Sequence, residues 1–205
     1  MLKFYNQTEL ELWVTKLYTN LNFRYPSDLN EEIISDSIGI ELFFKPKPSM
    51  RYDSGDYKSI TIDSRQPRRQ QRVLFYHELG HILRGHTGKQ HMMEKAFREL
   101  QEAQASHFIM YAAIPFYMVV QMDLPHCDRD IISLFVQEFG VSDKVARDRV
   151  DQINRRIFQG QVDENLKQKA QQEYTKAVPQ PYSSQTVRLL EQLKKQTGKD
   201  VLRYV

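Results

Sequence analysis

Hydrophobic positions in the first third of the chain change from helical spacing to strand-like composition. Helices are expected at residues 8–20 and 29–38, and strands at residues 38–44 and 59–63. Thr8 and Asn30 stand where an N-cap is needed, because their side-chain oxygens can accept hydrogen bonds from free backbone N–H groups. The last of these strands alternates as a half-buried strand should. The pattern predicts two helices followed by a small antiparallel sheet.

Apolar residues keep helical spacing through most of the remaining chain. Further helices are expected at residues 71–83, 92–113, 129–139, 143–158 and 186–196. A short turn, Gly140-Val141-Ser142, joins two of them in the layout of a helix-turn-helix motif. The second helix of this pair carries five basic residues: Lys144, Arg147, Arg149, Arg155 and Arg156. Because their charge is spread around the helix, packing is favoured over direct DNA binding, which stays an alternative.

Composition changes after residue 158, where the chain becomes charged and rich in glutamine before Pro179 and Pro181 interrupt it. The sequence therefore predicts three parts. Residues 1–125 form a core, residues 126–158 a helical pair packed on it, and residues 159–205 a helical C-terminal extension.

Overall composition limits the class of protein. With 40% hydrophobic and 11% aromatic residues, the chain can bury a substantial core. A formal net charge of +3 is weak support for a nucleic-acid partner. Cys127 is the only cysteine, which excludes an intramolecular disulfide and a cysteine-based zinc site. Neither a signal peptide nor an apolar run of membrane-spanning length is found, so we expect a cytoplasmic protein without membrane association.

One short motif carries chemistry: His77-Glu78-Leu79-Gly80-His81, inside the helix expected at 71–83. Residues four apart share a helix face, so the two imidazoles can bind one metal ion. Glu78 is rotated off that line and can act as the general base. A solvated helix with chance His and Glu residues is the alternative. Unpaired imidazoles are costly to bury in an apolar helix, so we favour one zinc ion per chain.

A catalytic zinc ion needs a third protein ligand. The extended motif with a third histidine fails, because Arg84 and Thr87 occupy the positions where it requires glycine and histidine. Gly85 and His86 are each displaced from those positions by one residue. The helix expected at 92–113 offers Glu102 at the edge of its apolar stripe, with Glu99 as a rival one turn earlier. A carboxylate pointing towards a core needs a cation, which favours Glu102 over a surface salt bridge.

These segments resemble the ImmA/IrrE family of metallopeptidases. The resemblance rests on residues 77–81, on residues 102–108 and on Pro115, and it departs from the family at Ile109, where alanine is usual. It implies zinc bound by His77, His81 and Glu102, with Glu78 as general base. It also implies a mostly helical α+β fold, a zincin-like core with a small antiparallel sheet beside the HExxH helix.

The resemblance also suggests what the protein does. ImmA-like proteins of mobile elements cleave the element's own helix-turn-helix repressor. By analogy we expect a site-specific zinc endopeptidase of a phage or integrated element, with such a repressor as its protein substrate. The alternatives are a non-proteolytic transcriptional regulator and a toxin–antitoxin component that keep the zinc-site fold and act by binding DNA or protein.

Peptide hydrolysis also needs a donor for the oxyanion and a surface that holds the peptide. His107, Tyr111, Tyr57 and His126 are candidates for the donor. We expect an edge strand around Tyr57–Ile62 to hold an extended peptide by strand addition, with an ordinary sheet edge as the alternative. The basic stretch 65–72 could attract an acidic partner, although a solvated helix start is the commoner reason for such a run.

Overall fold

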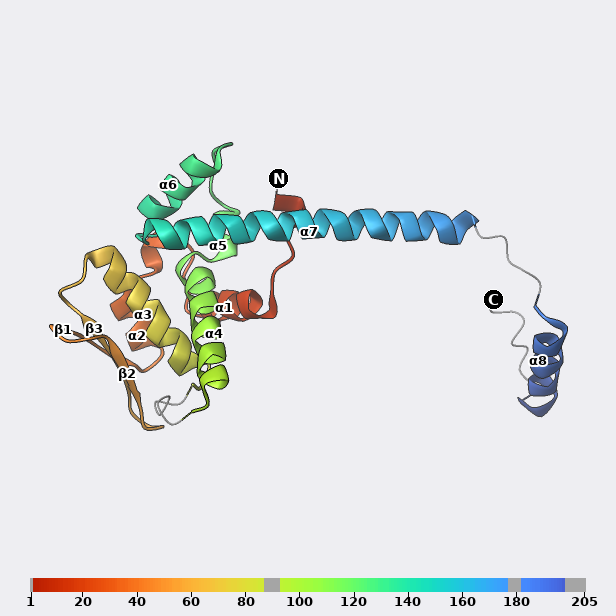
Figure 1. The fold of residues 1–205 in the computed structure, drawn as a ribbon, viewed down its shortest axis with the longest axis horizontal. Coiled ribbons are helices and arrows are strands. Elements are labelled where there is room, and N and C mark those ends of the chain that lie inside the picture. The colour runs from red at the N-terminus through yellow and green to blue at the C-terminus, as the bar shows by residue number, and fades with distance from the viewer. Residues whose placement is uncertain (1, 87–92, 177–181, 198–205) are drawn as a thin grey trace. The chain divides into compact units, whose positions relative to one another are not determined.

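The computed structural model describes residues 2–86, 93–176 and 182–197. Contacts divide the chain into two compact units, one ending at Gln161 and one beginning at Val162. The first unit begins with α1 (Glu9–Asn20), which has a short 3-10 helix before it (Leu2–Phe4) and another after it (Pro26–Asp28) in the sequence. Helix α2 (Glu31–Ser37) and three strands follow: β1 (Glu41–Lys45), β2 (Met50–Asp53) and β3 (Lys58–Asp63). The remaining elements, labelled in Figure 1, are helices: α3 (Arg68–Leu83), α4 (Lys95–Ala113), α5 (Phe116–Val119), α6 (Asp128–Glu138), α7 (Asp143–Lys176) and α8 (Ser184–Thr197).

Both predicted N-caps are confirmed. The Thr8 hydroxyl accepts a hydrogen bond from the backbone N–H of Glu11, whose carboxylate accepts the N–H of Thr8 in return. Asn30 caps α2 in a similar way, by accepting hydrogen bonds from the N–H groups of Glu32 and Ile33. These caps fix where the two N-terminal helices begin and so where their apolar sides meet the core.

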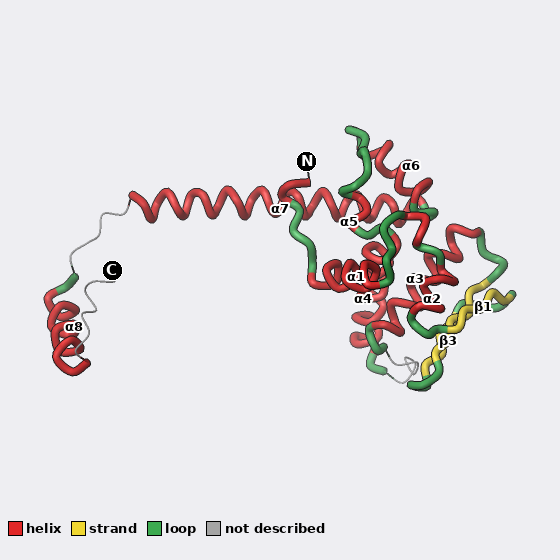
Figure 2. Tube along the Cα trace, turned by 180° about the vertical axis from the view of Figure 1, so that it is seen from behind, coloured by secondary structure: helices red, strands yellow, loops and turns green. Residues whose placement is uncertain are grey.

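The three strands, drawn in yellow in Figure 2, form one sheet in the order β1-β3-β2. The α+β class, mostly helical with a small sheet, is confirmed, but the sheet is mixed and not wholly antiparallel. Strand β1 pairs with β3 in parallel, and β2 pairs with β3 antiparallel. Two successive chain reversals, one after β1 and one after β2, return β3 to the direction of β1.

The position of β3 corrects two further expectations. It is the central strand, hydrogen-bonded on both sides, so the edge strand predicted around Tyr57–Ile62 is wrong. Residues 59–63 are also all buried, so they do not alternate between buried and exposed. The edges of this sheet are β1 and β2.

Helix α3 lies between the sheet and α4 (Figure 1). The close contact with α4 depends on Gly80, because a Cβ at that position would lie 2.9 Å from Cδ1 of Phe108. Phe108 is itself buried and has no room to turn away. Absence of a side chain at Gly80 therefore brings the two helices together at the level of the HExxH motif. Met92, where this helix was predicted to begin, lies outside the described residues, and α4 begins at Lys95.

Helices α6 and α7 correspond to the predicted helical pair. Gly140 has a positive φ of 63°, and Ser142 accepts a hydrogen bond from the N–H of Val145 at the start of α7. The second helix is much longer than predicted and runs without a break from Asp143 to Lys176. Arg149, expected among its surface basic residues, is fully buried. It therefore serves packing and has no role on a DNA-facing surface.

Two features concern the rest of the chain. Within the described residues, no helix is both long and apolar enough to cross a membrane. In the second unit, α8 contains no buried residue, and Pro179 and Pro181 lie outside the described residues. The predicted boundaries at residues 125 and 158 stay predictions.

Candidate metal centre

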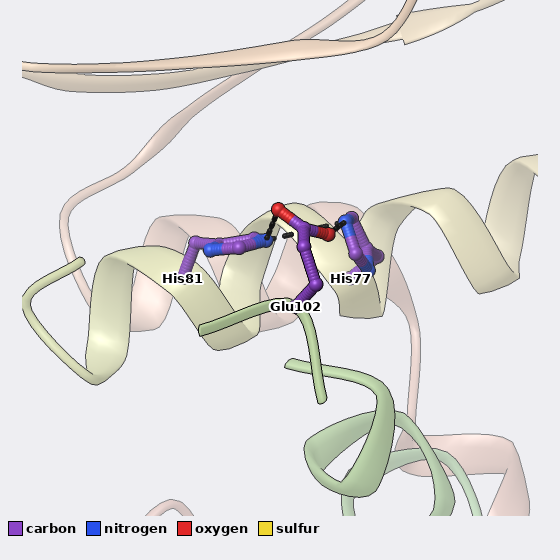
Figure 3. Close-up of side chains that lie close together, drawn as sticks. All are labelled: His77, His81 and Glu102. Carbon is purple, nitrogen blue, oxygen red and sulfur yellow. Dashed lines mark hydrogen bonds and ion pairs between the residues drawn. The ribbon is translucent and has the colours of Figure 1, made fainter. Parts of the chain in front are cut away.

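Helices α3 and α4 bring the three predicted metal ligands together (Figure 3). The Nε2 atoms of His77 and His81 lie 3.2 Å apart. Glu102 reaches across from α4, with Oε2 3.3 Å from His77 Nε2 and Oε1 3.5 Å from His81 Nε2. The rival, Glu99, is instead 3.7 Å from Nζ of Lys95 on its own helix. Residue spacing along α3 and the packing of α4 against α3 thus bring the three ligand atoms together at one point.

These separations suit a tetrahedral zinc ion. Ligand bonds of about 2.0–2.1 Å at tetrahedral angles hold neighbouring donor atoms about 3.3 Å apart. The observed separations of 3.2, 3.3 and 3.5 Å match that value closely. Two imidazoles and a carboxylate also form the ligand set of catalytic zinc sites that keep one position open. The residues therefore fit the ion that the sequence predicts.

The hydrogen bonds behind His81 fix its tautomer. His86 Nε2 lies 2.9 Å from Oε1 of Gln104, an atom that can only accept, so His86 donates from Nε2 and accepts at Nδ1. His81 Nδ1 lies 2.9 Å from that Nδ1 and must be its donor. The remaining nitrogen of His81, Nε2, therefore carries a lone pair directed towards the centre.

Burial keeps His81 neutral. Burial, together with the nearby positive charge of Arg51, lowers the pKa of His81 to about 3. A neutral Nε2 then faces the Glu102 carboxylate at 3.5 Å, so two electron-pair donors point at each other. Such an arrangement repels unless a cation lies between them. This pairing is the strongest sign of a metal site in the described part of the chain.

The general base predicted from the motif, Glu78, has a partner that the sequence analysis missed. Arg51 Nη1, on β2, lies 3.2 Å from Glu78 Oε2, and both side chains are close to 90% buried, with exposed fractions of 11% and 10%. The available signal was strand periodicity, which places Arg51 on the opposite face of β2 from Met50 and Tyr52. An arginine on the covered face of a strand needs an acidic partner.

His86 was also missed as a supporting residue. Gly85, with φ at 66°, turns the chain at the end of α3, so that the His86 N–H donates to the backbone oxygen of His81. The signal was a glycine directly before a histidine at the end of the motif helix. The sequence analysis weighed His86 only as a metal ligand. Thr87, which occupies the third-histidine position of the extended motif, lies outside the described residues.

Two of the candidate oxyanion donors, Tyr57 and Tyr111, contact other groups, and His126 is exposed. The Tyr57 hydroxyl donates to Glu41 Oε2 at 2.8 Å. Tyr111 is buried with the Arg149 guanidinium 5.0 Å from its ring centre. His107 is exposed and lines a cavity that also includes Tyr111 and Gln104. Their role in hydrolysis stays a prediction.

Most of the basic stretch at residues 65–72 is engaged within the chain. Arg65 is paired with Asp63, and both Arg68 and Arg72 are paired with Glu31. These contacts favour a structural role over an external acidic partner for the three arginines.

Comparisons with known proteins find similar sequences and one similar structure. Residues 35–151 match the family model Peptidase M78, described as the IrrE N-terminal-like domain. The XkdA protein of the phage-like element PBSX of Bacillus subtilis (strain 168) is 32% identical over 73% of this chain and 75% of its own length. The uncharacterized protein YqaB of the same strain is 30% identical over 76% of this chain and 90% of its own. A Mycobacterium tuberculosis transcriptional regulator has a TM-score of 0.47 at 15% identity, over 68% of this chain and 54% of that one.

Proposed function

The chain belongs to the Peptidase M78 family, and from this premise we propose that it is a zinc-dependent, site-specific endopeptidase. The observation that carries the proposal is the convergence of His77, His81 and Glu102, whose ligand atoms all lie within 4.8 Å of one another. When bound there, zinc supplies Lewis acidity that polarises the scissile carbonyl and lowers the pKa of the attacking water.

The chain's own residues supply the proton transfers. Glu78 follows His77 on α3, so its carboxylate is held beside the cluster without being one of the three ligands. It accepts the proton of the attacking water and later delivers it to the leaving nitrogen. Arg51 fixes its orientation through the 3.2 Å contact.

An extended peptide needs a partner strand. Strand β2 is an edge of the sheet, and Arg51 in it reaches the general base. We place the peptide along β2, where backbone pairing would hold it extended beside α3. This strand replaces the one expected around Tyr57–Ile62.

The proposed substrate is a helix-turn-helix repressor of a phage or integrated element. The resemblance to ImmA-like proteins suggests it, and the relative from the phage-like element PBSX supports the mobile-element context. Repressor cleavage would release the genes that the repressor silences.

The test is to incubate the zinc-loaded protein with the repressor encoded beside its gene and to follow fragments by mass spectrometry. We expect one cut, which a chelator abolishes and added zinc restores. Glu78→Gln should bind zinc normally and cleave roughly 100- to 10,000-fold more slowly, the usual worth of a general base. Glu99→Gln is the matched control and should cleave normally. Repressor inactivation by Glu78→Gln at the wild-type rate would instead indicate a binding regulator.

A further inference from the structure

Strand β2 directs one side chain towards the catalytic helix. Arg51 is paired in register with Ile60 of β3, and cross-strand partners point to the same face. Ile60 is fully buried, so this is the covered face of the sheet. The flanking residues Met50 and Tyr52 are on the opposite face and are 48% and 55% exposed. Arg51 is thus the β2 residue that contacts Glu78, and β2 is the edge along which the peptide is proposed to bind.

The guanidinium has a fixed place there. Its Nη1 lies 3.2 Å from Glu78 Oε2, and both side chains are close to nine-tenths buried. An arginine presents several N–H donors in a rigid plane, so it can contact one oxygen while another donor stays directed elsewhere. The positive group therefore lies beside the general base, which directly follows the metal ligand His77 on α3.

We propose that Arg51 is a catalytic residue, the donor that stabilises the oxyanion during peptide hydrolysis, an inference that rests on the proposed function. It takes the role for which the sequence suggested His107, Tyr111, Tyr57 or His126. A peptide paired along β2 would run beside Arg51, so a carbonyl oxygen of that peptide can accept from its guanidinium.

Charge movement during the reaction explains why the pair is suited to this task. The water oxygen bonds to the carbonyl carbon, the carbonyl π electrons move onto its oxygen, and the water proton goes to Glu78. Negative charge thus leaves Glu78 as it appears on the substrate oxygen, and Arg51 stays paired throughout. When the carbon–nitrogen bond breaks, its electron pair leaves with nitrogen, which receives the proton from Glu78, and the carbonyl re-forms.

Binding of inorganic phosphate, a tetrahedral oxyanion, tests this role without requiring cleavage. The comparison is between cobalt-loaded Glu78→Gln and the cobalt-loaded double variant Arg51→Met/Glu78→Gln. Neither protein leaves a buried carboxylate without its arginine, so the comparison isolates the guanidinium. The visible cobalt spectrum reports phosphate binding, and cobalt stoichiometry with the melting temperature reports an intact site.

Phosphate should bind roughly 10-fold or more weakly to the double variant, as expected when a charge-assisted hydrogen bond is lost. Equal phosphate affinity, or no phosphate binding by either protein, would overturn the inference. Adding Arg65→Met to Glu78→Gln provides the matched control, because Arg65 is paired with Asp63 outside the site, and it should leave the phosphate affinity unchanged.

Cleavage gives an independent measurement. Arg51→Met should lower kcat by roughly 100- to 1,000-fold with a smaller change in KM, as for loss of one oxyanion donor. Arg51→Lys should recover part of kcat, because it keeps the charge. An unchanged kcat in Arg51→Met would contradict the role of Arg51 while leaving the peptidase proposal intact. Absence of cleavage by the wild-type protein would contradict the peptidase proposal, and the phosphate comparison would still decide whether Arg51 binds an oxyanion.

Discussion

At the scale of single residues, the site works through the orientation of His81. Its Nδ1–H donates to His86, and His86 in turn donates to Gln104, so the lone pair of Nε2 is fixed on the side of Glu102 and His77. Residues behind a metal ligand tune its basicity and hold the ring in place. The chain from Gln104 to His81 is therefore part of the metal centre.

Replacing His86 tests this chain. His86→Ala should weaken zinc binding roughly 10- to 100-fold, the usual effect of removing such a partner. His126→Ala changes an exposed histidine and should leave zinc affinity unchanged. Competition with a chelator measures both. Equal zinc affinities for wild type and His86→Ala would show that the relay does not orient His81.

The choice between Glu102 and Glu99 gives a second prediction. Glu102→Gln removes the carboxylate that faces both imidazoles and should weaken zinc binding by more than about 100-fold, beyond the effect of a supporting residue. Glu99→Gln should have no effect, because Glu99 is an exposed side chain near Lys95. Zinc titration of both variants provides the measurement, and the reverse order of affinities would contradict the assignment.

Residue spacing made His77, His81 and Glu102 predictable, because helical periodicity is local. Arg51 and His86 were missed for different reasons. Arg51 meets Glu78 only after a strand packs on a helix 27 residues further along the chain. His86 depends on the positive φ of Gly85, whose effect on the following side chain was not weighed.

At the scale of elements, the crossing of α3 and α4 determines whether Glu102 can reach the histidines. Gly80 permits this crossing, since a Cβ there would approach Cδ1 of Phe108 to 2.9 Å. Order in the sheet was harder to predict. Composition located β1 and β3 but not β2, and strand order depends on which edges pair across the chain, a signal that is not local.

Gly80→Ala tests the helix crossing. In an exposed helix this change would stabilise by about 1 kcal/mol. Here overpacking against Phe108 should destabilise by about 1–3 kcal/mol and weaken zinc binding, because α4 must shift away from α3. Urea denaturation measures the stability, and adding Phe108→Leu should restore part of it. A more stable Gly80→Ala protein with normal zinc affinity would contradict the importance of this contact.

At the scale of the whole first unit, a buried ionic network joins distant segments. Arg149 on α7 donates to Glu11 Oε1 at 2.9 Å, to Gln152 Oε1 at 2.6 Å and to the backbone oxygen of Ile114 at 3.1 Å. The Tyr5 hydroxyl donates to the same Glu11 carboxylate, and burial raises the pKa of Tyr5 to about 12. The network ties the N-terminal segment, α1 and the end of α4 to α7.

Removing the arginine should be strongly destabilising. Arg149→Met leaves Glu11 buried without its cation and should cost about 3–5 kcal/mol in the free energy of unfolding. Arg147→Met removes an exposed pair with Asp143 on the same helix and should cost no more than about 0.5 kcal/mol. Urea denaturation compares them. Similar losses in the two variants would show that the network is not what stabilises this unit.

The organisation of the whole chain was only partly predictable. The helical pair and its turn at Gly140 followed from glycine and capping signals. The length of α7 was not predicted, because the change to a charged, glutamine-rich composition after residue 158 was interpreted as the start of a separate extension. Such residues are nevertheless compatible with a continuing helix. Arg149 was expected among the surface basic residues because its partner Glu11 lies 138 residues away in the sequence.

The claim that supports the whole account is that His77, His81 and Glu102 hold one zinc ion. The most direct test is a crystal structure of the zinc-loaded protein with anomalous data at the zinc edge. The account predicts one peak per chain, about 2.0–2.2 Å from both imidazole Nε2 atoms and from a Glu102 oxygen, with Glu78 outside the ligand shell. A zinc ion bound elsewhere, or a Glu102 carboxylate turned away from the two histidines, would contradict it.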